Sequence, residues 1–504
     1  MGADILAGLA MIADWHNIFF IVCGVSIGIV LGSIPGLTAT MGIALIIPVT
    51  FYMNPVASIS MLIGAYKGGL FGGSISAILI GAPGTDSASA TVEDGYPLAK
   101  QGKAGKALKM AVFASVMGDL IGLSALIILS PTIAKIALKI GPGDFAMIMV
   151  FSLTIVAGVA GKSLTKGLLS CAFGLLFGSI GMDPIIGLQR LTFEIGALDN
   201  GISLLAFLIG LFAIPEIITQ MEKKLSHSEP LLLRSSNPAD NNISWKEFKE
   251  NLKFIFLGGG IGIIIGAIPG IGPTPSAWLT YGQAKNFSKK PEKFGKGALE
   301  GVAAAESGNN AACGGALIPM FTLGVPGSST VAILMGAFII QGIFPGPMIF
   351  KENGPFVYAT FAGLVISNIV LFFLALTAVK TIAPFLCNAP RKIIFPIILA
   401  FCFVGSFAVT TAVFDMRIML AFGLLGYLMR KFDFPAAPML IGFILGPIGE
   451  RAVRQFMIIA DNDITKILNY PIADLFLLLT IVSIIGIART NWKKGRSERK
   501  EMTT

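Results

Sequence analysis

The stretch GSIPGLTATMGIALIIPVTF, residues 32–51, places a proline and a glycine inside an otherwise apolar run. A helix that crosses a bilayer satisfies its backbone internally, because lipid offers no hydrogen-bond partners. Proline removes a donor and blocks the carbonyl one turn earlier, and glycine permits the dihedral angles that follow. A nearly identical break, GAIPGIGPTPSAWLTY, returns at residues 266–281. The two stretches predict broken membrane helices at matching places in two halves of the chain.

The composition is that of a membrane protein. The 504 residues are 54% hydrophobic and 13% charged, whereas soluble domains carry about 25% charged residues. Residues 15–66, 254–284 and 307–350 contain no Asp, Glu, Lys or Arg. A spanning helix requires about 20 apolar residues, and these runs lack the alternation of a membrane barrel. We therefore predict an all-α polytopic membrane protein with about 10–12 transmembrane helices plus re-entrant or broken helices.

The distribution of polar residues predicts four parts: a first transmembrane repeat (1–220), a cytoplasmic linker (221–252), a second transmembrane repeat (253–488) and a basic cytoplasmic tail (489–504). Lysines gather in 100–109, in 285–296 and in the linker, and such loops face the cytoplasm. The N-terminal region, which lacks basic residues, is expected outside.

This distribution also predicts the relation between the repeats. The helix before Pro35 enters from outside and the one before Pro269 from inside, so the two repeats are expected to have inverted topology. The net charge of +9 is attributed to cytoplasmic loops, and we expect no nucleic-acid partner.

A second break recurs after the first. IGAPGTDSAS at residues 80–89 is similar to LGVPGSSTVA at residues 323–332. A helix that starts mid-membrane has free N–H groups and a partial positive charge, which suit a carboxylate. The alternative is ordinary kinks with hydroxyls that only cap helices. The predicted substrate-binding residues at the breaks are Gly36, Thr38, Thr40, Gly84, Thr85, Ser87, Gly270, Thr274, Ser276, Gly327, Ser328, Ser329 and Thr330.

Ionisable residues inside apolar segments form a second group of candidates, because each is costly at membrane depth. Lys67 is predicted as a counter-charge for an anionic substrate; the alternatives are pairing with Asp119 or Asp86, or a side chain that extends its charge to the membrane surface. Asp119 is a candidate for the coupling ion, or for a structural pair. Glu93 and Asp94 are expected to be surface partners of the lysines at 100–109.

Glu306, Asn309 and Asn310 lie together in AAAESGNNAACGG and offer oxygen ligands to a coupling ion. Their alternative role is hydrogen bonding between helices. We find no catalytic constellation, no paired-cysteine metal site and only two histidines, so we expect neither an enzyme nor a cofactor beyond a coupling Na⁺ or H⁺.

The sequence around the second breaks resembles that of a known protein family. Residues 72–108 and 297–338, with GPGDFAMIMVFSLTIVAG from Gly141 and GMDPIIGLQRLTF from Gly181, closely resemble the large membrane (permease) subunit of the tripartite tricarboxylate transporter family. The resemblance runs from about Asn17 to Arg489.

The resemblance implies a secondary transporter of the prokaryotic cell membrane that imports carboxylates such as citrate by cation symport. It also implies two partners, a small membrane subunit and an extracytoplasmic solute-binding protein. Lys67 and Asp119 depart from the usual family pattern, which has an uncharged and a small residue there. The competing hypothesis is an ion channel or cation/proton antiporter with the same broken helices.

Overall fold

The computed structural model describes residues 2–35, 38–159, 163–183, 186–222, 237–381, 391–410 and 412–485. Almost all of the regular structure in these residues is helical, and the two-residue strands β1 and β2 pair antiparallel with Gly181 opposite Arg190. Seven helices are long and apolar enough to cross a membrane, and several shorter apolar helices accompany them. The predicted all-α polytopic membrane protein is confirmed.

The elements of the first half are α1 (Gly2–Ile12), α2 (Trp15–Ser33), α3 (Ala39–Thr50), α4 (Pro55–Ile80), η1 (Asp86–Ala88), α5 (Ser89–Lys100), α6 (Ala104–Ala137), α7 (Pro142–Val159), α8 (Leu164–Gly178), β1 (Gly181–Met182), β2 (Gln189–Arg190), η2 (Gly196–Leu198), α9 (Leu204–Leu208), η3 (Ile209–Ala213) and α10 (Ile214–Glu222). The elements of the second half are α11 (Pro238–Asn241), α12 (Trp245–Ala267), α13 (Pro273–Phe287), η4 (Pro291–Lys293), α14 (Leu299–Leu323), α15 (Ser329–Ile340), α16 (Ile349–Glu352), α17 (Gly354–Thr381), α19 (Arg391–Thr410), α20 (Val413–Lys431), α21 (Ala436–Ile459) and η5 (Ile464–Asn469). A further apolar helix spans Pro471–Ile485.

The predicted linker and tail lie largely outside the described residues, since 223–236 and 486–504 are not among them. The helix that leads to the second break of the second half starts at Leu299, before the charge-free run 307–350, so Glu306 lies inside a helix. The sequence also gave no indication of α5 as a separate helix. Its 12 residues have low hydrophobicity because they mix charged, polar and small side chains.

Small residues allow the helix before each first break to pack closely on the helix before the second break of the same half. α2 packs on α4, and α12 packs on α14. Each first helix carries glycines at four-residue spacing, in GVSIGIVLG and GIGIIIG, and this spacing allows close helix approach. A Cβ on Gly32 would lie 2.1 Å from the Gly69 carbonyl oxygen, and one on Gly266 would lie 2.4 Å from that of Ala312. The similarity between the two halves of the sequence therefore includes the glycines of α2 and α12, which precede the first breaks.

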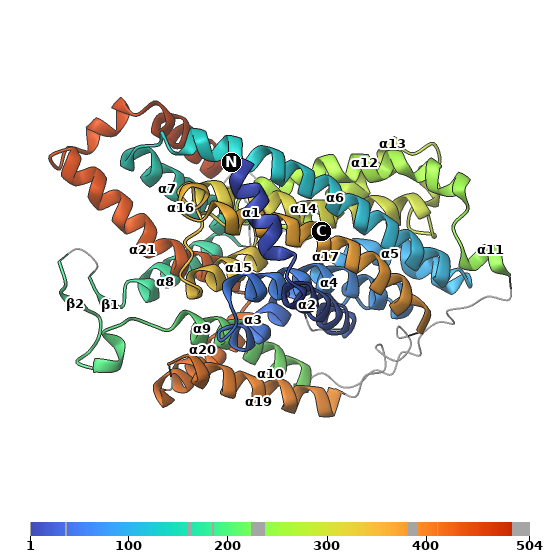
Figure 1. The fold of residues 1–504 in the computed structure, drawn as a ribbon, viewed down its shortest axis with the longest axis horizontal. Helices are drawn as coiled ribbons and strands as arrows, with labels where there is room; N and C mark the ends of the chain where they lie inside the picture. The colour runs from blue at the N-terminus through green and yellow to red at the C-terminus, as the bar shows by residue number, and fades with distance from the viewer. Residues whose placement is uncertain are drawn as a thin grey trace, which may run out of the picture.

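The long helices of the two halves also pack on each other in matching pairs. α6 of the first half lies on α14, and α17 of the second half lies on α4. α3 contacts α15, while α13 contacts η1 and α5. In Figure 1, α6, α12, α14 and α17 run alongside one another, with α7, α8 and α21 to the left and α19 and α20 along the lower edge. The matched halves form one interdigitated core.

The short helix after each second break ends in the same way. α5 and α15 each have 12 residues, and each is followed by a Gln-Gly pair, Gln101-Gly102 and Gln341-Gly342. The two glycines have φ values of 76° and 75°. Gln101 Nε2 donates to the Lys296 carbonyl at 2.7 Å, and Gln341 Nε2 donates to the Thr50 carbonyl at 3.1 Å. Each glutamine thus ties its helix to the opposite half of the chain.

These two contacts lie at opposite ends of α14. The helix begins at Leu299, just after Lys296, and ends near Pro345, whose carbonyl oxygen would lie 2.9 Å from a Cβ on Gly324. At 1.5 Å per residue its 25 residues make α14 roughly 37 Å long.

The three lysine-rich segments gather at the Lys296 end. Lys106 Nζ lies 2.6 Å from Glu247 Oε1 at the start of α12, and Lys109 contacts Asn242. Gln101, inside the cluster at 100–109, bonds the loop at 285–296. The three segments therefore lie on one face of the protein, and the assignment of that face to the cytoplasm stays a prediction.

Asp94 differs from the expectation that it is a surface partner of these lysines. It is fully buried, and its Oδ1 accepts hydrogen bonds from the backbone N–H groups of Gly295, Gly297 and Ala298 at 2.8–2.9 Å. A carboxylate satisfies the free donors at the start of a helix and suits the dipole there. Asp94 of the first half therefore holds the loop that leads into α14 of the second half, and the surface assignment was wrong.

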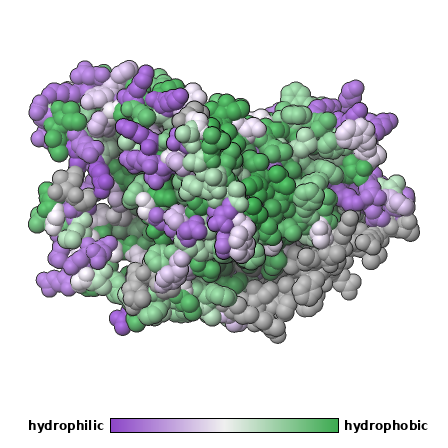
Figure 2. Space-filling view, viewed as in Figure 1, coloured by the Kyte–Doolittle hydropathy of each residue, from purple (hydrophilic) through white to green (hydrophobic). Residues whose placement is uncertain are grey.

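The visible surface fits a protein that spans a membrane. Figure 2 shows a broad apolar region over the centre of one face, with hydrophilic residues gathered towards its two ends. Large apolar side chains such as Ile128, Phe256 and Phe373 are more than half exposed. Apolar exposure on this scale is unusual on a soluble monomer and is typical of a lipid-facing surface.

Candidate functional site

The helices that lead into the first breaks of the two halves terminate in the same way. α2 ends at Ile34 and α12 at Ile268, both in extended conformation, and each N–H bonds the carbonyl three residues earlier at 3.2 Å. Gly270 then has a φ of 80°. Its counterpart Gly36 lies outside the described residues. The helices α3 and α13 begin a few residues later, as the sequence predicts.

The second breaks also match. α4 ends at Gly81 and α14 ends at Gly324, with φ values of 68° and 70°. The chain then folds back on its own helix, because Gly84 N–H donates to the Gly73 carbonyl and Gly327 N–H to the Ala316 carbonyl, both at 3.2 Å. A proline, Pro83 or Pro326, comes directly before each of these amides and restricts the backbone there.

Each second break packs tightly on the first break of its own half. A Cβ on Gly84 would lie 1.8 Å from the Gly32 carbonyl oxygen. A Cβ on Gly327 would lie 2.6 Å from the Gly266 carbonyl oxygen. Real Cβ atoms do not approach this closely, so both positions require glycine for space rather than for backbone angle.

The four breaks meet around one cavity of about 100 Å³. Hydroxyl groups dominate its lining, and they come from both halves of the chain. The lining residues are Thr38, Ala39, Thr40, Leu70, Thr85, Asp86, Ser87, Gly270, Ile271, Gly272, Pro273, Thr274, Ser328, Ser329 and Thr330. Nine of the predicted substrate-binding residues are therefore brought together here. Ser276 is not at the cavity but donates to the Gly308 carbonyl at 2.8 Å, and Gly84 and Gly327 support it from behind.

Several hydroxyls at the cavity have partners within the protein. Thr38 Oγ1 accepts from Met41 N–H and Ser328 Oγ accepts from Val331 N–H, both at 3.2 Å, so they cap α3 and α15. Thr40 Oγ1 and Thr330 Oγ1 lie 2.7 Å apart and join the two halves. A hydroxyl that accepts at a cap still has its own proton to donate. The lining therefore combines helix starts with donors of the kind that bind an anion.

Asp86 was not among the predicted site residues, although it lies in the quoted GAPGTDSAS break. It lines the cavity and is exposed. A carboxylate next to an anion site opposes anion binding unless a cation is bound as well. The position of Asp86 thus favours a site that takes an anion and a cation together.

Lys67 does not line this cavity. Its Nζ lies 2.6 Å from Asp119 Oδ2 on α6 and donates to the Leu364 carbonyl on α17, also at 2.6 Å. Both side chains are 2% exposed. Lys67 and Asp119 thus form the ion pair that the sequence offered as an alternative. In the structure Lys67 is not at the predicted substrate site.

Glu306 has a different environment. Its carboxylate accepts hydrogen bonds from Ser74 Oγ at 2.6 Å, Thr91 Oγ1 at 2.5 Å and Ser115 Oγ at 2.8 Å, all from the first half. The residue is fully buried. Within the described residues, no Lys, Arg or His lies at salt-bridge distance from it. A buried, unpaired carboxylate costs several kcal/mol, so a proton or a cation is required to neutralise it.

The two asparagines next to Glu306 also differ. Asn310 Nδ2 donates to the Glu306 backbone carbonyl at 2.9 Å. Asn309 is fully buried, and neither its Oδ1 nor its Nδ2 has a hydrogen-bond partner among the described residues. Most buried polar groups in folded proteins are hydrogen-bonded, and an exception requires an explanation such as a bound ion. Among the predicted coupling-ion residues, Asn309 thus has a side-chain amide with no hydrogen-bond partner within the described part of the chain.

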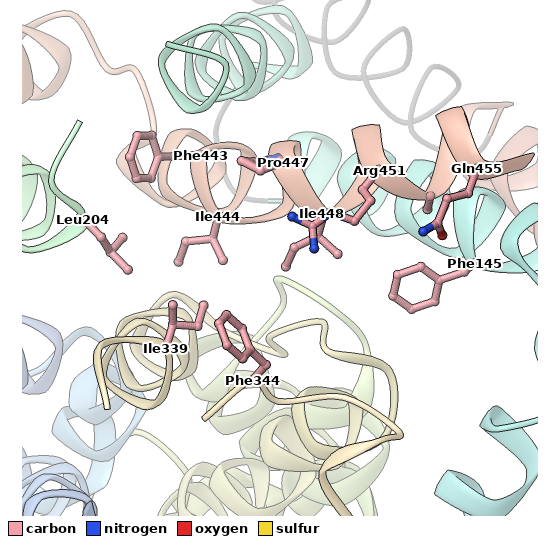
Figure 3. Close-up of a pocket in the computed structure, with 11 residues that line it drawn as sticks. Phe145, Leu204, Ile339, Phe344, Phe443, Ile444, Pro447, Ile448, Arg451 and Gln455 are labelled. Carbon is pink, nitrogen blue, oxygen red and sulfur yellow. The ribbon is translucent and has the colours of Figure 1, made fainter. Parts of the chain in front are cut away.

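A larger cavity of about 380 Å³ lies elsewhere, between α15, α21 and neighbouring segments. Figure 3 shows Ile339, Phe344, Ile444 and Ile448 facing one another there, with Arg451 near one end. Its lining is almost entirely apolar and carries none of the predicted site residues. An apolar lining of this kind does not suit a carboxylate.

Comparison with known proteins agrees with this architecture. A model of the tripartite tricarboxylate transporter TctA family matches residues 18–441. An Agrobacterium vitis protein, an uncharacterised 52.8 kDa protein in the TAR-I ttuC' 3' region, is 35% identical over 469 residues, which cover 93% of this chain and 92% of that protein. An uncharacterised protein in the TAR-II ttuC' 3' region of the same organism is 37% identical over 224 residues, covering 44% of this chain and 92% of that protein.

No solved structure gives a match. The family match covers most of the chain and includes both pairs of breaks, and the first Agrobacterium relative is similar along nearly its whole length. This chain therefore belongs to the tripartite tricarboxylate transporter TctA family, as a large, multi-pass membrane subunit.

Proposed function

We propose that this permease subunit imports carboxylates, citrate or similar di- and tricarboxylates, by symport with Na⁺ or H⁺. A small membrane subunit and an extracytoplasmic solute-binding protein would serve it as partners in the prokaryotic cell membrane. The observation that carries the proposal is the convergence of four helix breaks on one hydroxyl-lined cavity.

The cavity lining supports an anionic substrate. A carboxylate that leaves water loses favourable hydration unless fixed donors replace it. The starts of α3 and α15 supply free N–H groups, and each start carries a partial positive charge. The start of α13 contributes fewer donors, because Pro273 and Pro275 have no N–H. Hydrogen bonds to a charged acceptor contribute about 1.5–3 kcal/mol each. Two or three donors would offset a substantial part of the hydration that one carboxylate group loses.

The acidic residues support cation coupling. Asp86 at the cavity adds negative charge to a site for an anion, and Glu306 is a second buried carboxylate, held by Ser74. A bound Na⁺ or H⁺ neutralises such charge, and a hard cation binds to oxygen ligands of this kind. Binding of the cation and the anion would then favour each other, which is the thermodynamic basis of symport.

The arrangement of the repeats supports alternating access. Matching backbone at both breaks, together with Gln101 and Gln341 at opposite ends of α14, fits two repeats of inverted topology. Transporters built in this way bind substrate near the bilayer midplane and expose it alternately to the two sides. The cavity is smaller than the roughly 300–1,000 Å³ of pockets that enclose a drug-sized ligand, so a tricarboxylate would require the repeats to move apart.

The test is uptake of labelled citrate, succinate, tartrate and benzoate into vesicles that contain this chain with its two partners. Each substrate is tested with a sodium gradient, with a proton gradient and with neither. We expect uptake of at least one carboxylate that requires the solute-binding protein and one gradient. Cation flux without any carboxylate would instead support the channel or antiporter hypothesis.

A further inference from the structure

The ammonium of Lys67 occupies a site built from hard oxygen ligands. Asp119 supplies a carboxylate oxygen and Leu364 a backbone carbonyl oxygen, each 2.6 Å from Nζ. The ligands come from α6 and α17, which flank α4. Carboxylate and carbonyl oxygens are the groups with which proteins bind hard metal cations. The Lys67 side chain therefore brings its own positive charge to a position where the surrounding groups suit a free cation.

The matching position of the second repeat holds no positive charge. Gly81 and Gly324 end α4 and α14 with the same backbone conformation. Counted back from these glycines, Lys67 corresponds to Asn310 and Tyr66 to Asn309. In the first repeat this dipeptide thus consists of a phenol and an ammonium, and in the second of two amides that can offer oxygen ligands.

The second position also shows signs of an unmet requirement for positive charge. The carboxamide of Asn309 is fully buried and, among the described residues, has no hydrogen-bond partner at either end. One turn earlier, Glu306 is buried with hydroxyl donors only. The first repeat has a neutral pair of Lys67 and Asp119, whereas the second has a buried carboxyl group with no basic partner among the described residues.

We propose that the ammonium of Lys67 permanently takes the place of a sodium ion in the first repeat. Cation binding in this chain is then confined to the second repeat, beside Glu306 and Asn309. The duplicated backbone provides two equivalent cation positions, and one of them is filled by a tethered charge. The role of this site in transport rests on the proposed symport. The replacement of the Lys67 ammonium by a free cation can be measured without any substrate.

The experiment measures equilibrium binding of ²²Na⁺ to the purified full-length chain in detergent. Lys67→Met removes the charge but retains a side chain of similar length, and Lys67→Met/Asp119→Asn also removes the carboxylate ligand. Lys351→Met, on the exposed helix α16, is the matched control. We expect Lys67→Met to bind one sodium ion more per chain than wild type. The double variant and the control should bind as wild type does.

An equal amount of bound sodium in folded Lys67→Met and in wild type would overturn the proposal. If Lys67→Met does not fold, Lys67→Ala is purified in 200 mM methylammonium chloride or NaCl, with choline chloride as the control. We expect both small cations, and not choline, to raise its melting temperature. No difference among the three salts would equally contradict the tethered-cation assignment.

The outcome is separable from that of the proposed function. Wild type that binds no sodium would remove the sodium form of symport, yet Lys67→Met should still gain its one ion. Conversely, sodium-driven uptake by wild type with no gain in Lys67→Met would leave symport intact and refute only the role of Lys67.

Discussion

The two repeats of this permease share their backbone but not their buried charges. The glycines that end α4 and α14 have φ values within a few degrees, and the Gly84 and Gly327 amides bond back to their helices at the same distance. Against this match, α4 carries Lys67 paired with Asp119, whereas α14 carries Glu306 with three hydroxyl donors. The broken helices are thus common to both repeats, and the charges near them belong to one repeat each.

This difference separates two requirements of a transporter. Helix starts around a midplane cavity depend on backbone geometry, which a duplication preserves in both copies. Cation coupling depends on a few ionisable side chains, which substitution changes independently in each copy. In such a chain the cation position of the first repeat is filled by Lys67 and that of the second repeat is free. The anion site can then stay symmetric while the coupling cation binds in the second repeat alone.

The largest effect is expected where the backbones touch. Gly84→Ala and Gly327→Ala should reduce uptake to background, because the new Cβ would meet the Gly32 or Gly266 carbonyl oxygen at 1.8 or 2.6 Å. Gly282→Ala on α13 has open space around its Cβ and should transport normally. Vesicle uptake and membrane yield are measured for all three. Normal transport by both variants at the breaks would show that the two repeats do not depend on this close packing.

A large loss of stability is expected for Lys67→Ala. Removal of one partner from a buried ion pair typically costs about 3–5 kcal/mol, because the other charge stays buried and unpaired. Glu306→Gln, which keeps an acceptor for the hydroxyl donors and removes the charge, should be far better tolerated.

Unfolding midpoints in detergent at low sodium measure this difference. The double variant Lys67→Met/Asp119→Asn should recover most of the lost stability, because it leaves no buried charge. A Glu306→Gln variant as unstable as Lys67→Ala would mean that the charge of Glu306 is already neutralised within the protein.

An intermediate effect is expected for Ser328→Ala at the cavity. Loss of one hydrogen bond to a charged acceptor, about 1.5 kcal/mol at the low end, corresponds to roughly tenfold weaker apparent affinity. The variant also loses the N-cap of α15, so Ser244→Ala, which removes the N-cap of α12 away from the cavity, is the control. Concentration dependence of uptake distinguishes them. Unchanged affinity and maximal rate in Ser328→Ala would remove this hydroxyl from the site.

The smallest effect on activity, and the sharpest test of inversion, is expected from cysteine labelling. Single cysteines at Ser244, Lys290 and Lys351 should leave transport nearly unchanged in a background without the five native cysteines. An impermeant maleimide should label Ser244→Cys and Lys290→Cys only from the cytoplasmic side, and Lys351→Cys only from outside. Labelling of Ser244→Cys and Lys290→Cys from opposite sides would contradict inverted repeats.

The sequence predicted those parts of the site that depend on local chemistry. Proline, glycine and the hydroxyls after them break a helix wherever they occur, so residues such as Thr38 and Ser328 could be identified from the sequence alone. The prediction that the breaks lie together followed from the duplication of the two halves alone. The glycines of α2 and α12 and the paired Gln-Gly caps repeat as well, and a comparison of the two halves beyond the prolines would have found them.

What the sequence did not predict are partners that tertiary packing selects. The three hydroxyl donors to Glu306 come from α4, α5 and α6, and no spacing in the sequence relates them. Asp94 was expected at the surface because lysines follow it, yet it is buried and holds the loop before α14 of the other half. Asp119 was one of two possible partners of Lys67, and only the packing of α4 on α6 decides between them.

The central claim is that coupling runs through the second repeat, at Glu306. The most direct measurement compares two activities of Glu306→Gln in vesicles: exchange of a labelled carboxylate for an unlabelled one, and uphill uptake driven by the coupling gradient. We expect exchange to persist, because the hydroxyl-lined cavity is intact, and gradient-driven accumulation to be lost. Accumulation with unchanged dependence on the cation in Glu306→Gln would contradict the account and place the coupling ion elsewhere.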